Sequence, residues 1–124
     1  MNNFLGQINA KHGIFRFCLN DQHIGSALNE YGEFSEIELS IMDKFIQKDD
    51  YVFDIGSNIG AFTVPFSKKV GKNGKVFSFE PQPFIHNILL VFNITAGQPT
   101  FVYPNTFPDS SFTSLAELHG GFIE

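Results

Sequence analysis

The sequence has little positive charge, one cysteine, no tryptophan and no long apolar run. Eight Lys and Arg stand against 13 Asp and Glu, and the formal net charge of −5 argues against a surface for nucleic acid or anionic membrane. A single cysteine, Cys18, excludes an internal disulfide and fits a reducing compartment. No apolar run approaches the roughly 20 residues that span a bilayer, and the N-terminus lacks a signal-peptide pattern. We therefore expect a cytoplasmic protein.

Metal-binding and nucleophile patterns are also missing. The four histidines have no partners at the spacing of metal ligands, and Cys18 stands alone. No nucleophile–base pair stands out either. The sequence therefore predicts no metal site, and it leaves any catalytic residue unassigned.

What is present is a globular composition, with 43% hydrophobic and 17% charged residues. A chain of 124 residues is long enough for one core but not for two. We interpret it as a single, incomplete domain. Residues 1–34 form a β-rich lead-in, residues 35–95 a cofactor-binding core, and residues 96–124 a divergent tail.

The lead-in and the first helix have clear local signals. Gly13–Leu19 is predicted as a strand, and Asn20-Asp21 as a turn before a short second run. A helix is predicted over Ser35–Gln47, with Ser35 and Glu38 as a capping box and Phe34 and Leu39 as a hydrophobic staple. Its apolar face is predicted to consist of Ile37, Ile41 and Phe45, with Met42 and Ile46.

The rest of the core alternates between strands and helices. The predicted strands are Tyr51–Ile55, Lys75–Glu80 and Thr100–Tyr103; the predicted helices are one capped by Thr63 with Pro65 in its first turn, one over Pro83–Asn93, and one near Ser114–Leu118. Units this short are typical of βαβ crossovers. The fold class is therefore α/β, a partial Rossmann-like parallel sheet with helices on both faces.

The strongest indication of chemistry is the run YVFDIGSNIG (51–60), followed twenty residues after Gly60 by Glu80. Gly56 and Gly60 allow a tight turn and the close approach of a ligand, and Asn58 tolerates a left-handed backbone. Ligands of open α/β sheets lie beyond the carboxyl ends of the strands. A carboxylate there, such as Glu80, can accept both hydroxyls of a ribose.

Two classes of ligand fit this outline. The dinucleotide fingerprint can be matched with Gly56, Asn58 and Ala61, but Asn58 places a side chain where a pyrophosphate needs bare backbone. The negative charge of Asp54 would also repel a pyrophosphate. Asp54 suits S-adenosyl-L-methionine instead, which has an amino group and a sulfonium and no phosphate. Purely structural roles remain as alternatives: Asp54 capping the turn, and Glu80 pairing with a lysine.

The sequence resembles FkbM-family methyltransferases in four blocks: YGEFSE (31–36), VFDIGSNIGAFT (52–63), GKVFSFEPQP (74–83) and HNIL (86–89). These are class I enzymes that use S-adenosyl-L-methionine and mostly methylate hydroxyls of sugars and natural products. The resemblance implies a set of cofactor-binding residues: Asp54, Gly56, Ser57, Asn58 and Gly60 beside the methionine half, Glu80 at the ribose, Pro81 and Gln82 near the adenine, and Tyr31 and Glu33 in a segment folded over the pocket.

The resemblance fades after Phe92, whereas a class I sheet has further strands that carry the substrate-facing residues. We expect the sheet edge beside Tyr51–Ile55 to lack a neighbour, and we expect self-association there. Three functions follow: a methyltransferase acting on an oxygen of a small, sugar-like acceptor; an inactive cofactor-binding remnant or interaction module; or an NAD-dependent oxidoreductase.

Overall fold

The computed structural model describes the backbone of residues 4–96 and 100–103 and the side chains of residues 4–90. The elements are β1 (Leu5–Ala10), β2 (Gly13–Cys18), α1 (Ile24–Tyr31), α2 (Glu36–Met42), β3 (Tyr51–Ile55), α3 (Thr63–Val70), β4 (Lys75–Phe79), α4 (Pro83–Ala96) and β5 (Thr100–Tyr103). The predicted helix near Ser114–Leu118 lies outside the described residues.

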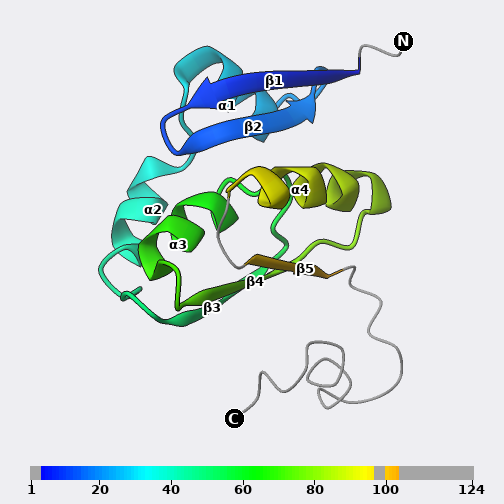
Figure 1. The fold of residues 1–124 in the computed structure, drawn as a ribbon. Helices are drawn as coiled ribbons and strands as arrows, with labels where there is room; N and C mark the ends of the chain where they lie inside the picture. The colour runs from blue at the N-terminus through cyan, green and yellow to red at the C-terminus, as the bar shows by residue number, and fades with distance from the viewer. Residues whose placement is uncertain (1–3, 97–99, 104–124) are drawn as a thin grey trace.

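The main sheet is parallel, with the order β3-β4-β5. Tyr51 pairs with Lys75, and Val76 pairs with Thr100, so each strand meets a partner 24 residues further along the chain. The connecting helices α3 and α4 lie on one face of this sheet (Figure 1). The predicted strand Thr100–Tyr103 coincides with β5. The α/β, Rossmann-like prediction is confirmed.

On the opposite face of the sheet, the side chains of β3 are exposed to solvent. Tyr51, Phe53 and Ile55 are 53%, 56% and 69% exposed, whereas Asp54 points inward and is 9% exposed. The Phe53 ring stacks on Phe77 of β4, with 5.0 Å between ring centroids. Of the helices expected on both faces, those that connect the described strands cover only one.

The lead-in is a β-hairpin followed by a helix, whereas the sequence predicted a strand, a turn and a short second run. β1 pairs antiparallel with β2, and the short run after Asp21 forms α1, so the prediction of a strand there is wrong. Phe15 and Phe17 of β2 form the main core with Leu28, Ile59, Val64 and Ile88. This core joins the hairpin to α4, which lies beside it in Figure 1.

Helix α2 differs from its prediction in length, cap and orientation. It ends at Met42, followed by turns that lead to Ile46. Ser35 has φ 54° and makes no capping bond to the backbone; its hydroxyl donates to the Glu38 carboxylate instead. Leu39 and Ile46 are buried, whereas Ile37, Ile41 and Phe45 are exposed. Most of the predicted apolar face therefore faces outward, and Ile46 is the exception.

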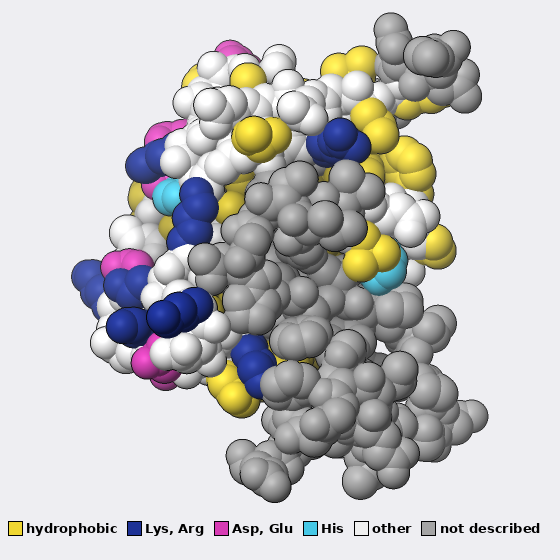
Figure 2. Space-filling view, viewed as in Figure 1, with side chains coloured by type: hydrophobic (Ala, Val, Ile, Leu, Met, Phe, Trp, Pro, Cys, Tyr) yellow, Lys and Arg dark blue, Asp and Glu magenta, His cyan; other side chains and the backbone are white. Residues whose placement is uncertain are grey.

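On the face shown in Figure 2, Lys and Arg side chains gather on one side of the molecule, with Asp and Glu among them. The ion pairs of the described residues include Lys69 with Asp43 at 2.8 Å and Lys11 with Glu36 at 2.5 Å. The described part of the chain contains no helix with the length and apolar character needed to traverse a bilayer.

Candidate functional site

The glycine turn after β3 has the backbone conformation that its sequence predicts. Gly56, Asn58 and Gly60 have φ angles of 81°, 49° and 91°, in the left-handed region that glycine and asparagine tolerate. The N–H groups of Gly56 and Ser57 both donate to the Phe79 carbonyl, at 2.8 and 3.0 Å. These two bonds fix the turn against the end of β4, which is the edge where ligands bind in such sheets.

The two glycines serve different purposes. A Cβ added to Gly56 would meet no atom within 4 Å, so this side of the turn is open. A Cβ added to Gly60 would lie 2.9 Å from Cδ1 of Leu89, so Gly60 lets α4 pack directly against the turn. The bare backbone that a ligand could approach is therefore at Gly56.

The carboxylate of Asp54 belongs to a buried hydrogen-bond network with hydroxyl groups. Thr63 Oγ1, at the first residue of α3, lies 2.5 Å from Asp54 Oδ2 and 2.9 Å from Ser78 Oγ. Ser57 Oγ donates to the Asp54 carbonyl at 2.6 Å. Burial raises the pKa of the Asp54 carboxyl above its usual value, although hydrogen bonds from Thr63 and Ser57 oppose the change. Asp54 thus joins β3, β4 and α3.

Glu80 is 3% exposed and holds two loops together. Its Oε2 accepts the Asn58 N–H at 2.9 Å, and its Oε1 accepts the Gln82 N–H at 2.8 Å. A carboxylate has about four acceptor positions, so two remain after these bonds. The alternative of a lysine partner is not what the structure has, because both bonds come from neutral backbone groups.

Together, Asp54 and Glu80 place two buried carboxylates on either side of the turn. No cation among the described residues forms an ion pair with either of them. Buried charge without a counter-ion is unfavourable, and a bound cation relieves it. This arrangement favours a ligand that brings positive charge and disfavours one that brings phosphate.

The remaining predicted residues divide into near and distant ones. Pro81 and Gln82 follow Glu80 directly and are exposed. Tyr31 is 70% exposed at the end of α1, and Glu33 pairs with Lys11 of the hairpin at 3.4 Å. Phe34, which follows Glu33, packs against the core that includes Ile59 of the turn, and its ring lies 6.4 Å from that of Phe62 between centroids. The structure therefore does not bring Tyr31 and Glu33 into contact with the glycine turn.

Ser78 is not among the site residues predicted from the sequence, and Thr63 is predicted only as a helix cap. Both side chains are completely buried and hold the Asp54 network together. The available signal was a lone serine within the apolar strand KVFSF. A buried hydroxyl needs a hydrogen-bond partner, so such a serine indicates a polar neighbour on an adjacent element.

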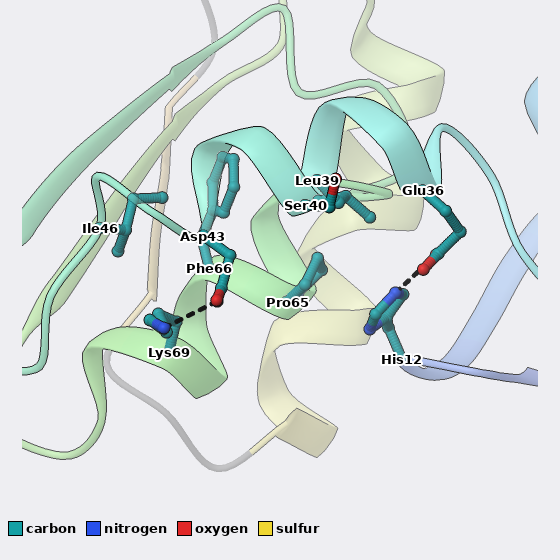
Figure 3. A pocket seen from close by; sticks show the side chains of 9 residues that line it. All are labelled: His12, Glu36, Leu39, Ser40, Asp43, Ile46, Pro65, Phe66 and Lys69. Atoms are coloured by element: carbon teal, nitrogen blue, oxygen red, sulfur yellow. Dashed lines mark hydrogen bonds and ion pairs between the residues drawn. The ribbon is translucent and has the colours of Figure 1, made fainter.

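A groove of about 260 Å³ lies elsewhere, between α2 and α3 (Figure 3). Its floor is apolar, from Leu39, Ile46 and Phe66, and an ion pair stands at each end: His12–Glu36 and Asp43–Lys69. None of the predicted cofactor-binding residues lines it. Over the described ranges, no group of three or more His, Cys, Asp or Glu could hold a metal ion.

Lys11 and His12 both bond Glu36, and we call these three residues the hairpin clamp. Lys11 Nζ lies 2.5 Å from Glu36 Oε2, and His12 Nε2 lies 2.7 Å from Glu36 Oε1. Burial acts to raise the pKa of Glu36, but the hydrogen bonds from Lys11 and His12 outweigh it and lower that pKa. The clamp joins the hairpin turn to α2.

No protein-family model and no curated protein sequence matches the chain. Solved structures do match its fold. They include a SAM-dependent methyltransferase from Aquifex aeolicus (23% identity, TM-score 0.50, 64% of this chain and 45% of that one). A SAM-dependent O-methyltransferase from Thermotoga maritima matches with 20% identity and TM-score 0.51, over 78% of this chain and 39% of that one.

A protein-L-isoaspartate O-methyltransferase matches with 20% identity and TM-score 0.50, over 54% of this chain and 22% of that one. At these identities the likeness concerns the fold, which is the Rossmann-like arrangement of these methyltransferases. The chain spans less than half the length of each of these three structures.

Proposed function

We propose that this chain carries the S-adenosyl-L-methionine-binding half of a methyltransferase of the FkbM type. The observation that carries the proposal is the pair of buried carboxylates, Asp54 and Glu80, held by neutral donors beside the open Gly56. A ligand with an amino group, a sulfonium and a ribose complements this set in charge and in hydrogen bonding. The methyltransferase structures of similar fold support the same choice.

The roles of the residues follow from where they stand. Gly56 lets the methionine half lie against bare backbone, and Asp54 supplies the charge opposite the positive groups. The two free acceptor positions of Glu80 take the ribose hydroxyls, and Pro81 and Gln82 follow at the adenine. Methyl transfer needs little beyond the alignment of the acceptor oxygen with the methyl group. The acceptor is a small, sugar-like molecule, and the protein acts in the cytoplasm.

The second candidate is an inactive remnant that shares its fold with part of each methyltransferase structure. In this case it retains the glycine turn and acts as a cofactor-binding or interaction module without turnover. An NAD-dependent oxidoreductase is the third. The buried Asp54 carboxylate and the Asn58 side chain both act against a pyrophosphate at this turn.

Self-association through β3 accompanies this proposal. Among the described strands, β3 has only β4 as a neighbour, so its outer edge offers unpaired backbone groups. A lysine on an edge strand blocks such pairing, so Ile55→Lys should reduce any association that uses this edge.

Calorimetric titration with S-adenosylmethionine, S-adenosylhomocysteine and NAD tests the function. We expect the first two to bind, and we expect Glu80→Gln to weaken S-adenosylmethionine at least about tenfold, which corresponds to about 1.4 kcal/mol. Glu38→Gln, at an exposed position on α2, is the matched control and should leave the affinity unchanged. Binding of NAD alone would overturn the proposal, and binding of none of the three would favour the remnant.

A further inference from the structure

Helix α2 presents an apolar stripe to solvent. Ile37, Ile41 and Phe45 are 78%, 47% and 75% exposed and recur every fourth residue. After Met42 the chain continues in tight turns: the N–H groups of Lys44 and Phe45 bond carbonyls three residues earlier, and that of Ile46 bonds the Met42 carbonyl. These turns carry the stripe on to Phe45. We call these three residues the α2 stripe. Residues four apart lie on one side of a helix, so the stripe forms a continuous surface.

The stripe is not needed to attach α2 to the rest of the fold. Leu39 and Ile46 do so from the other side, where they line the groove against α3 (Figure 3). The described residues provide no partner for the stripe. Three large apolar side chains at helical spacing are typical of a surface that another helix covers.

The stripe and its flanking charges are self-complementary about Ile41. Ile37 stands four residues before it and Phe45 four after, while Glu38 stands three before and Lys44 three after. If two such helices cross antiparallel at Ile41, each Ile37 faces Phe45 of the partner subunit. Each Glu38 then faces Lys44 of the partner subunit. Both Glu38 and Lys44 are exposed, and neither forms an ion pair with another described residue.

We propose that the α2 stripe binds the α2 stripe of a second copy of this chain, antiparallel and across a two-fold axis at Ile41. Such an interface is isologous, so one surface satisfies both partners. Opposite charges meet at both ends, and the antiparallel helix dipoles also attract each other. The charge pattern favours a second copy over an unrelated helix, because the order Glu38, Ile41, Lys44 is its own complement.

The dimer should be weak, so that it forms and dissociates as the protein concentration changes. Three side chains per copy are far fewer than the roughly 20–30 residues per partner in a standard stable interface. Exposed charge pairs are screened by salt, so dissociation should increase with ionic strength. The interface differs from the outer edge of β3 and can be tested separately from it.

Sedimentation velocity of the full chain over a range of concentrations, from micromolar to millimolar, tests the proposal. We expect reversible dimerisation, weakened at least tenfold by Ile41→Glu, which places two carboxylates together at the axis. Lys44→Glu alone should weaken it severalfold, because it opposes like charges. The double variant Glu38→Lys/Lys44→Glu should restore it, because the charges are complementary again.

Lys72→Glu, an exposed substitution with the same change in net charge, should leave dimerisation unchanged. Circular dichroism checks that each variant is folded. A monomer at every concentration would overturn the proposal, as would a double variant that stays as weak as Lys44→Glu. A dimer that Ile55→Lys dissociates and Ile41→Glu does not would assign association to the β3 edge instead.

Discussion

Two regions of this molecule bind buried or half-buried carboxylates with different kinds of hydrogen-bond donor. At the strand ends, Asp54 and Glu80 accept hydrogen bonds from hydroxyl and backbone N–H groups. In the hairpin clamp, Glu36 accepts from Lys11 and His12. The pKa of Asp54 is raised, chiefly by burial, whereas the pKa of Glu36 is lowered, because the hydrogen bonds from Lys11 and His12 outweigh its burial. Lys11 therefore brings positive charge to Glu36, whereas no cation among the described residues pairs with Asp54 or Glu80.

Glu80→Ala should lower the stability most, because Glu80 joins the loop after β3 to the loop after β4. The substitution removes the buried carboxylate that accepts the N–H groups of Asn58 and Gln82, and each hydrogen bond to a charged group contributes about 1.5–3 kcal/mol. We expect the free energy of unfolding, measured by urea titration, to fall by several kcal/mol. Asp43→Ala, which removes half of an exposed ion pair, is the control. Equal losses in the two variants would contradict the distinction between the regions.

Thr63→Val should give an intermediate effect with a characteristic pH dependence. It removes the hydroxyl that bonds Asp54 and Ser78, at a cost of about 1–3 kcal/mol, whereas Thr63→Ser keeps that hydroxyl. Because the Asp54 pKa is raised in the folded state, stability falls as pH rises from the ordinary aspartate pKa through the folded one. Loss of a donor raises that pKa further. The destabilisation, followed by thermal unfolding, should therefore grow with rising pH, and a constant difference would refute this account.

Glu36→Gln should give the smallest effect. The Glu36 side chain is 24% exposed, and a pair at the surface contributes at most about 1 kcal/mol. Since the pKa of Glu36 is lowered, its contribution is present above the ordinary glutamate pKa and disappears as pH falls through the folded pKa. Wild type and variant should therefore converge in acid, and also at high salt. A larger gap in acid than at neutral pH would show that Glu36 acts otherwise.

Much of the core could be predicted because its signals are local. The strands at Tyr51–Ile55 and Thr100–Tyr103, and the left-handed turn at Asn58, follow from apolar runs and glycine spacing. The orientation of α2 could not. Period four correctly groups Ile37 with Ile41, but it does not say whether the chain itself or another surface covers them. The strand β1, with glycine and polar residues in LGQINA, lacks the pattern of its partner β2.

For the candidate site, the positions of its residues along the chain could be predicted, but their hydrogen-bond partners could not. The positions of Asp54, Gly56 and Glu80 at strand ends followed from the sequence. The partners did not, because Thr63 and Ser78 meet Asp54 only when α3 packs on the sheet. Likewise, the bonds from Asn58 and Gln82 to Glu80 depend on two loops lying side by side. Such pairings belong to tertiary structure, which no single segment encodes.

The regular register of the parallel sheet bears on how the chain folds as it is synthesised. Tyr51 and Val76 each pair with a residue 24 positions later in the chain. Among the described strands of this sheet, those that are consecutive in the sequence pair with each other. At about 5–20 residues per second, each partner follows within roughly one to five seconds on the ribosome. The sheet can therefore grow by one βα unit at a time, in the order in which the units emerge.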